Sequence, residues 1–173
     1  GVQTLRDEAG LAALEKTELD AFGRVVSTTD AAGGVRQRAY DRLGRVVQTT
    51  DATSSKRYST YDAFNRVLTQ SDALGNVTTF TYDVAERTIT MRTPEGIVTK
   101  AASNRHGEVI GKTDGMGQVT EFSYDRNGRL VTTTTPLTTE TTTYDLAGRV
   151  QTTLDANGTQ VKYTYDAVDR VKT

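Results

Sequence analysis

The stretch 144-YDLAGRVQTTLDANGTQVKYTYD-166 decides the fold, because it begins and ends on the same Tyr-Asp pair, 21 residues apart. Two runs rich in Val, Thr and Tyr, residues 149–154 and 159–165, alternate with two polar runs, 145–148 and 155–158. Val, Thr and Tyr favour β-strands, and Asp and Gly favour turns. The stretch therefore predicts two antiparallel strands, one hairpin that leads into the next.

The Tyr-Asp pair recurs along the chain at spacings of 21 residues, with one spacing of 20. Its copies are Tyr40-Asp41, Tyr61-Asp62, Tyr82-Asp83, Tyr124-Asp125, Tyr144-Asp145 and Tyr165-Asp166, with degenerate copies at Leu19-Asp20 and Ser103-Asn104. Three residues after each Asp or Asn stands Gly23, Gly44, Asn65, Glu86, Gly107, Gly128, Gly148 or Asp169. All of these except Glu86 tolerate a left-handed backbone, so each copy predicts a turn.

A second turn is expected about ten residues after the first one. It begins at Asp7, Asp30, Asp51, Asp72, Asp114 and Asp155, and at the Thr93-Pro94 and Thr135-Pro136 pairs. The two turn series give 16 turn positions and hence about 16 strands plus a C-terminal stub. We predict an all-β fold of tandem antiparallel β-hairpins of about 21 residues that form a twisted, spiralling β-strip.

Neither face of this strip is strictly apolar. In residues 45–50, Arg45, Val47 and Thr49 fall on one face, and Val46, Gln48 and Thr50 on the other. Only 35% of the residues are hydrophobic. A β-sandwich alternates apolar and polar residues more cleanly, so the pattern predicts a wall that water reaches on both faces.

The whole chain, residues 1–173, is predicted to be one repeat array, with about seven regular repeats over residues 20–173. Residues 1–19 form an irregular first repeat, in which residues 8–19 fit either a bulged strand or an amphipathic helix. The chain begins at Gly1 with the pattern already under way. We therefore expect a fragment of a larger protein.

The composition argues against several functional classes. The formal net charge of −1 gives no reason to expect a nucleic-acid partner. The chain has no Cys, and no apolar run approaches the roughly 18 residues of a membrane span. The N-terminus also lacks the layout of a signal peptide.

No catalytic constellation stands out, so we expect neither an enzyme nor a cofactor. His106 is the sole His and lies in an expected turn. The turn Asp residues suit turn capping and pairing with the Arg four residues later, although Ca²⁺ binding is the alternative that their carboxylates suggest. The Tyr residues suit cross-strand aromatic pairing, with sugar stacking as the alternative.

The repeating unit Tyr-Asp-x-x-Gly-Arg-Val/Leu resembles the YD repeat of the Rhs (rearrangement hotspot) family. The resemblance covers residues 20–173 well and 1–19 loosely. Its structural signature falls on Tyr40, Asp41, Gly44, Arg45, Tyr61, Asp62, Arg66, Tyr82, Asp83, Tyr124, Asp125, Gly128, Arg129, Tyr144, Asp145, Gly148, Arg149, Tyr165 and Asp166.

Membership in that family implies a spiralling strip that closes into a hollow shell. Such repeats occur in bacterial polymorphic toxins, including type VI secretion effectors, in the encapsulating component of insecticidal toxin complexes, and in teneurins. The implied partners are the rest of the shell and a C-terminal toxin, and the implied location is outside the bacterial cell. Glycan binding and self-association through open strand edges are further expectations.

Overall fold

The computed structural model describes residues 2–5 and 15–172, and these residues contain strands and turns but no helix. The chain divides into two units, which are described separately. One consists of Gly1–Phe80 and Thr93–Glu95, and the other of Thr81–Arg92 and Gly96–Thr173.

The strands follow one another in chain order, as predicted for tandem hairpins. The first unit holds β1 (Val2–Leu5), β2 (Glu15–Leu19), β3 (Val25–Thr29), β4 (Val35–Tyr40), β5 (Val46–Thr50), β6 (Lys56–Tyr61), β7 (Val67–Ser71) and the start of β8 (Val77–Asp83). The second unit holds β9 (Thr88–Arg92), β10 (Val98–Ser103), β11 (Val109–Thr113), β12 (Val119–Tyr124), β13 (Leu130–Thr134), β14 (Thr139–Tyr144), β15 (Val150–Leu154), β16 (Gln160–Lys162), β17 (Thr164–Tyr165) and β18 (Val171–Lys172).

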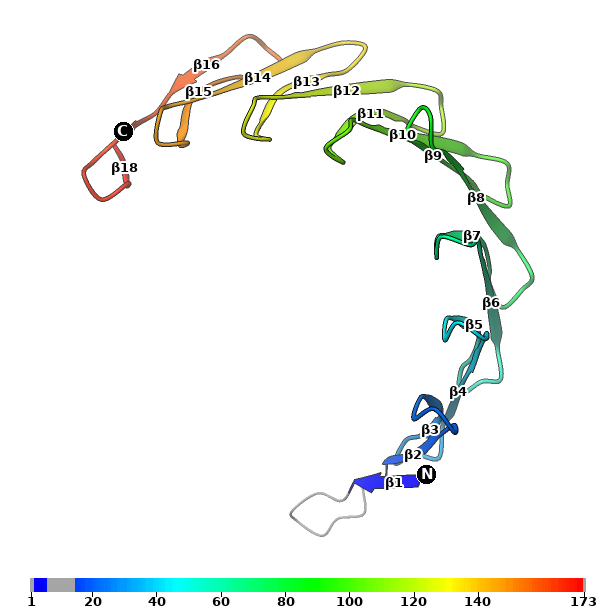
Figure 1. Cartoon of the computed structure of the whole chain (residues 1–173). Coiled ribbons are helices and arrows are strands. Elements are labelled where there is room, and N and C mark those ends of the chain that lie inside the picture. Colours follow the sequence, from blue (N-terminus) through cyan, green and yellow to red (C-terminus); the bar gives the residue numbers. More distant parts are fainter. Residues whose placement is uncertain (1, 6–14, 173) are drawn as a thin grey trace. The chain divides into compact units, whose positions relative to one another are not determined.

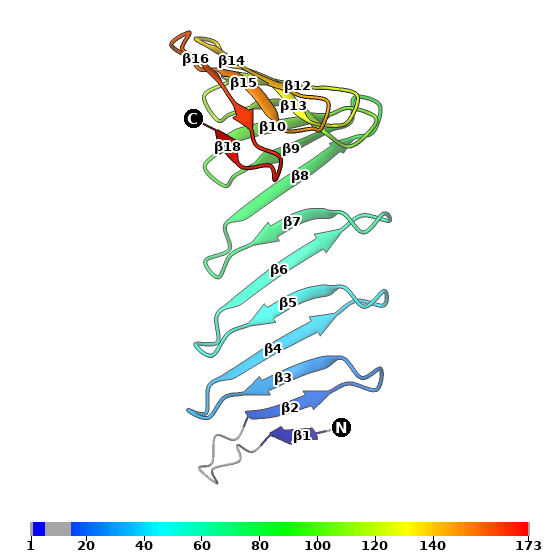
Figure 2. The ribbon, with the colours of Figure 1, turned by 90° about the vertical axis from the view of Figure 1, so that its left-hand side faces the viewer.

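Each strand lies beside its neighbours in sequence. The sheet runs in the order β1 to β16 without closing on itself, and β17 and β18 form a separate two-stranded sheet. Figures 1 and 2 show the successive strands β2 to β7 of the first unit as neighbouring rungs. The expected all-β fold of tandem antiparallel hairpins is confirmed. The strand expected over residues 159–165 is divided into β16 and β17, and the expected C-terminal stub corresponds to β18.

The turn that follows each Tyr-Asp pair or its degenerate copy is here called the signature turn. Its copies share the same two backbone hydrogen bonds, except for the copy after Tyr82. In the copy at 41–45, Asp41 N–H donates to the Arg45 carbonyl at 2.9 Å, and Gly44 N–H donates to the Asp41 carbonyl at 3.1 Å. All seven positions predicted to tolerate a left-handed backbone have positive φ: Gly23, Gly44, Asn65, Gly107, Gly128, Gly148 and Asp169. Glu86, the exception in the sequence, is not among them, and the next residue, Arg87, takes φ 50° instead.

The second turn varies more in length than the signature turn. Asp114 N–H donates to the carbonyl of Gln118, four residues later, at 3.0 Å. In the repeat that is one residue shorter, Thr135 N–H donates to the carbonyl of Thr138, only three residues later, at 2.8 Å. The missing residue is therefore absorbed in a second turn.

The sheet is a single layer without a hydrophobic core. No described side chain is fully buried. The accessible surface is 12504 Å², whereas a compact protein of 18.8 kDa exposes roughly 8300 Å². Both faces of the sheet are therefore open, as the mixed composition of the strands predicted.

The segment 1–19 is only partly described. The turn expected at Asp7 and residues 8–14, where a bulged strand and a helix were both considered, lie outside the described residues. Residues 15–19 form strand β2, which pairs with β3.

Two glycines of one repeat both have room for a Cβ atom but differ in backbone conformation. Replacing each of them by Ala therefore tests how much the left-handed conformation alone contributes to stability. A Cβ added at Gly107, where φ is +84°, or at Gly111, a strand residue without positive φ, meets nothing within 4 Å. We expect Gly107→Ala to lower the free energy of unfolding by about 1 kcal/mol, because an L-residue is strained in the left-handed region. Gly111→Ala is expected to leave it unchanged or raise it by about 0.5 kcal/mol. Urea denaturation followed by circular dichroism measures both, and equal losses would contradict this explanation.

Candidate functional site

In six signature turns, the Asp holds the turn together with both carboxylate oxygens. Asp41 Oδ1 accepts the backbone N–H groups of Leu43 at 2.9 Å and Arg45 at 3.0 Å. Asp41 Oδ2 accepts the Arg45 Nε–H at 2.7 Å. The same Asp–Arg pairing recurs in Asp20–Arg24, Asp62–Arg66, Asp125–Arg129, Asp145–Arg149 and Asp166–Arg170.

These contacts keep the signature carboxylates ionised. The backbone N–H of Arg45 is the main cause that lowers the pKa of Asp41 below its ordinary value, and the Arg45 side chain adds to it against a partial opposing effect of burial. For Asp125 the Arg129 side chain is the main cause that lowers the pKa. Because an ionised carboxylate only accepts hydrogen bonds, it suits a turn whose neighbouring groups are all donors.

In the turns of Arg24, Arg45, Arg129 and Arg149, the signature arginine also contacts the Tyr of the next repeat. Arg45 Nη1–H donates to the Asp62 carbonyl at 2.7 Å, and its guanidinium carbon lies 4.8 Å from the centroid of the Tyr61 ring. Such a cation–π contact contributes about 0.5–1 kcal/mol at an exposed site. The same stacking joins Arg24 to Tyr40, Arg129 to Tyr144 and Arg149 to Tyr165.

The hydroxyl of the stacked Tyr returns a hydrogen bond to the preceding repeat. Tyr61 OH donates to the Val46 carbonyl at 2.8 Å, and Val46 directly follows Arg45. Equivalent bonds join Tyr40 to Val25, Tyr124 to Val109, Tyr144 to Leu130 and Tyr165 to Val150. We call the Asp and Arg of one signature turn, together with the Tyr of the next, the latch.

A β-bulge places the Tyr where the latch needs it. In the β6–β7 pair, the register shifts between Thr60 and Tyr61, so that Thr60 pairs with Thr69 and Tyr61 with Val67. The same shift precedes Tyr40, Tyr124 and Tyr144. A bulge locally bends the strand and redirects side chains. It also precedes Leu19 and Ser103, whereas β17 and β18 pair without a register shift.

The degenerate turn at Asn104 keeps the geometry with reversed polarity. Asn104 Oδ1 accepts the N–H groups of His106 at 2.8 Å and Glu108 at 3.1 Å, and Asn104 Nδ2–H donates to Glu108 Oε2 at 2.6 Å. His106 is an exposed turn residue whose Nε2 accepts the Arg105 Nε–H at 3.1 Å. An amide and a carboxylate thus replace the usual carboxylate and guanidinium.

The turn after Tyr82 departs furthest from the pattern. Tyr82 and Asp83 end strand β8, and Asp83 Oδ1 accepts the Glu86 N–H at 2.9 Å. Arg87 Nε–H donates to the Ser103 carbonyl at 3.2 Å rather than to a turn carboxylate. The residue with positive φ is thus displaced by one position, from 86 to 87.

Comparison with known proteins identifies the repeat. The profile of the RHS Repeat family matches residues 20–56, 61–98, 104–140 and 144–173. The chain belongs to the RHS repeat family. No curated protein matches this RHS repeat chain.

A solved structure shares the fold of this RHS repeat chain. The crystal structure of TcdB2-TccC3-Cdc42 matches 98% of this chain with a TM-score of 0.65 and 19% identity. A Photorhabdus luminescens Tc holotoxin pore with mutated TccC3 matches 92% of it with a TM-score of 0.48 and 17% identity. This chain spans only 12% and 9% of those two chains. The first match therefore establishes the fold alone.

In this RHS repeat chain, the signature residues form the turns and the contacts between neighbouring repeats. The Asp oxygens are engaged in turn hydrogen bonds, and nowhere in residues 2–5 and 15–172 do three metal-ligating side chains gather into a site that could hold a metal ion. Within those same ranges, no helix is long and apolar enough to cross a membrane. The fold is that of a repeat scaffold.

Sequence reasoning predicted the turns but missed most of the latch. It anticipated the pairing of each Asp with the Arg four residues later, but not the stacking of that Arg on the next Tyr. It also missed the regular bulge and the backbone acceptor of the Tyr hydroxyl, for example the carbonyl of Val46. The signal was present, because a Tyr repeated at one position of a half-buried sheet needs a constant partner for its hydroxyl.

Two tyrosines of strand β6 test the latch. Tyr61 donates its hydroxyl to Val46, whereas Tyr58 is 47% exposed and its hydroxyl makes no hydrogen bond to the described part of the chain. We expect Tyr61→Phe to lower the free energy of unfolding by about 1 kcal/mol. Tyr58→Phe should change it by less than about 0.3 kcal/mol, because no hydrogen bond is lost. Chemical denaturation compares the two, and a similar effect of both would argue against the latch.

A double substitution tests whether the Asp41–Arg45 pair can be replaced by an Asn–Glu pair, as found at Asn104 and Glu108. Arg45→Glu places a carboxylate beside Asp41 and should lower the midpoint of unfolding strongly. Adding Asp41→Asn reproduces the Asn104–Glu108 pair, so we expect partial recovery of the midpoint. Recovery stays incomplete because Glu cannot stack on Tyr61 as a cation. Thermal unfolding of the wild type, both single variants and the double variant measures this coupling, and a double variant no better than Arg45→Glu would contradict it.

Proposed function

We propose that the chain is a wall segment of an Rhs-type shell that encloses a toxic effector or other cargo for delivery out of a bacterial cell, in interbacterial competition or virulence. The observation that carries this proposal is a one-layer sheet, held together repeat by repeat through the latch, with both faces open. Such a sheet can separate two compartments, whereas it offers no enclosed core for catalysis. The repeats of residues 1–173 act as one array in this role.

The comparisons support the proposal at the level of fold. The RHS Repeat profile covers most of the chain, and a Tc toxin crystal structure that contains TccC3 shares its fold. Because the chain spans a small part of that structure, the remainder of the shell and a C-terminal toxin are proposed partners. Pairing of open strand edges between copies of the chain also stays a prediction.

The signature tyrosines support the structural role better than sugar binding. A sugar would stack on a free ring face, but the ring of Tyr61 is covered by Arg45 and its hydroxyl is bound to Val46. The same arrangement holds for Tyr40 and Tyr165. One ring face and the hydroxyl of these tyrosines are therefore already engaged, which favours the structural role over a carbohydrate-binding repeat module.

Protease protection tests the proposed shell in the complete gene product that carries these repeats. We expect a polypeptide segment outside the repeats to resist a nonspecific protease in the wild type. The latch variant Arg45→Met with Arg149→Met should expose that segment to cleavage. Arg42→Met with Arg126→Met, at exposed turn positions, removes the same charge and should retain protection.

Mass spectrometry of the fragments over time distinguishes the outcomes. Cleavage of every segment outside the repeats in the wild type, at the rate seen after unfolding, would contradict encapsulation. A complete gene product with no polypeptide or co-purified cargo besides the repeats would contradict it as well. Equal exposure in the latch variant and in the charge-matched control would show that the latch does not maintain the wall.

A further inference from the structure

Two strand positions of each repeat, four and two residues before the signature Tyr, take no part in the latch. In two adjacent repeats, arginines occupy three of these four positions. Four residues before the signature Tyr or its degenerate counterpart, the chain carries Glu15, Arg36, Arg57, Thr78, Thr99, Thr120, Glu140 and Val161. Two residues before it stand Thr17, Arg38, Ser59, Phe80, Ala101, Phe122, Thr142 and Tyr163. The latch requires no cation at either position. The three arginines of β4 and β6 are therefore a local feature and not a consequence of the repeat.

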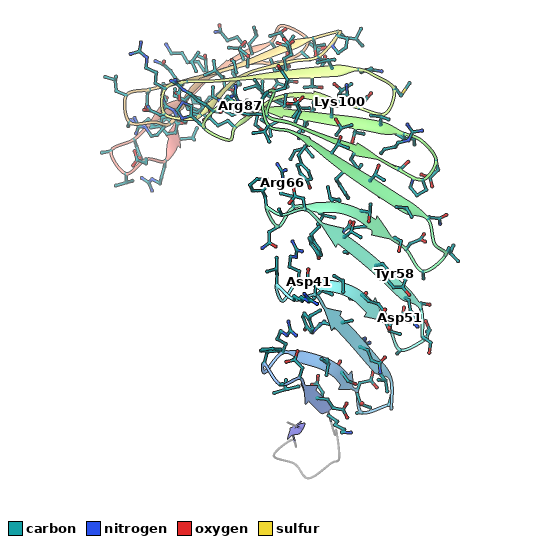
Figure 3. The ribbon with its side chains drawn as sticks, turned by 45° about the vertical axis from the view of Figure 1, so that its right-hand side comes forward. Asp41, Asp51, Tyr58, Arg66, Arg87 and Lys100 are labelled. Carbon is teal, nitrogen blue, oxygen red and sulfur yellow. The ribbon has the colours of Figure 1, made fainter. Side chains whose placement is uncertain are left out.

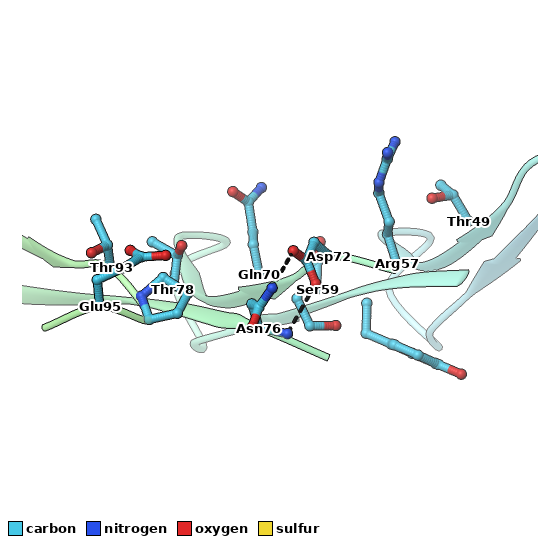
Figure 4. A pocket seen from close by; sticks show the side chains of 12 residues that line it. Thr49, Arg57, Ser59, Gln70, Asp72, Asn76, Thr78, Thr93 and Glu95 are labelled. Carbon is cyan, nitrogen blue, oxygen red and sulfur yellow. Dashed lines mark hydrogen bonds between the residues drawn. The ribbon is translucent and has the colours of Figure 1, made fainter. Parts of the chain in front are cut away.

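Strand register places these arginines on one face of the first unit. Arg36 pairs with Thr28, Arg38 pairs with Thr49, and Thr49 pairs in turn with Arg57. Directly paired residues share a face, and strands lie about 4.8 Å apart, so the Cα atoms of Arg38 and Arg57 are roughly 10 Å apart. Figure 4 shows the side chains of Thr49 and Arg57 projecting from the same side of the sheet.

A groove of about 260 Å³ lies between these side chains. Its lining includes Thr28, Arg36, Arg38, Thr49 and Arg57. Arg57 also borders the adjoining concavity of about 600 Å³ that Figure 4 shows, where Gln70 and Ser59 continue the polar lining. Guanidinium and hydroxyl donors thus line a continuous depression within one unit.

The charge of the groove is only partly neutralised. The Arg36 Nη1 atom lies 3.6 Å from Asp30 Oδ2. The pKa of Asp51 is lowered mainly by the Thr53 hydroxyl, and the charge of Arg57 helps to lower it. Within the described residues, neither Arg38 nor Arg57 forms a close ion pair or a hydrogen bond. Asp51 lines one end of the groove, where its Oδ1 accepts the N–H groups of Thr53 and Ser55. Figure 3 places Asp51 at the sheet edge opposite that of Asp41. Two arginines therefore face solvent with unused donors.

We propose that this groove, defined by Arg36, Arg38 and Arg57, binds the carboxylates of an acidic, extended polypeptide segment. An arginine fork binds a carboxylate through two parallel hydrogen bonds, and arginines on alternate strands can hold successive acidic side chains. Among the described residues that line the 260 Å³ groove there is no aromatic ring, and Tyr58 lines only the adjoining concavity, so the arginines rather than a stacking ring are the main recognition groups. This inference does not depend on the proposed encapsulation role, because Arg36, Arg38 and Arg57 belong to the first unit and take no part in the latch.

Fluorescence anisotropy of the chain with a labelled peptide of alternating Glu and Ser tests the proposal. We expect saturable binding that weakens as salt is raised, and no binding of the matched Gln-Ser peptide. Arg38→Gln with Arg57→Gln should weaken binding roughly tenfold or more, because each substitution removes a charged hydrogen-bonding partner. Arg42→Gln with Arg126→Gln makes the same change in net charge at exposed turn positions and should weaken binding less than about twofold.

Circular dichroism and the midpoint of unfolding verify that both double variants are folded. Equal weakening by the two variants would reduce the effect to net charge and overturn the site. Failure of the wild type to bind the acidic peptide at low salt would overturn it too. A sulfated oligosaccharide that binds through Arg38 and Arg57 while the peptide does not would overturn the assignment to a polypeptide. Each result is independent of whether the complete gene product protects a cargo.

Discussion

The structure depends on a guanidinium group that serves two repeats at once, as Arg24, Arg45, Arg129 and Arg149 do. Arg45 closes its own turn through Asp41 and then holds the following turn through the Asp62 carbonyl and the Tyr61 ring. Because no described side chain is fully buried, the usual cohesion of a hydrophobic core is missing. Coupling between nearest neighbours replaces it, which is the energetic logic of a quasi-one-dimensional repeat protein.

The parts of the fold that depend on local chemistry could be predicted from the sequence. Strand propensity and positive-φ residues such as Gly44 are written in short stretches, so the sequence alone indicated strands, turns and period. The acceptor of the Tyr61 hydroxyl lies 15 residues away at Val46, and its position depends on a bulge that the alternation of residues does not reveal. Likewise, Glu86 was visible as an exception, but only the backbone shows that Arg87 takes its place.

The latch also separates framework positions from positions that are free to vary. The third residue of a signature turn donates its N–H to the Asp carboxylate, as Phe22, Leu43 and Phe64 do. The turn itself needs no particular side chain there, although the rings of Phe22 and Phe64 lie under the guanidinium groups of Arg24 and Arg66. The side chains of this third residue are correspondingly exposed in all three turns. Arg38 and Arg57 occupy free positions of another kind, on the open face of a strand. A repeat of this design can change its surface chemistry without disturbing its own cohesion.

The short second turn at Thr135–Thr138 shows where such a chain tolerates a change in length. Although this repeat is one residue shorter, Tyr144 still donates to Leu130 and still lies under Arg129. Single-residue insertions and deletions in the gene should therefore survive selection at second turns and be removed at signature turns. Duplication of one repeat's worth of coding sequence reproduces a complete latch at each new junction. Over evolutionary time, such a gene can lengthen in whole repeats while its register is preserved.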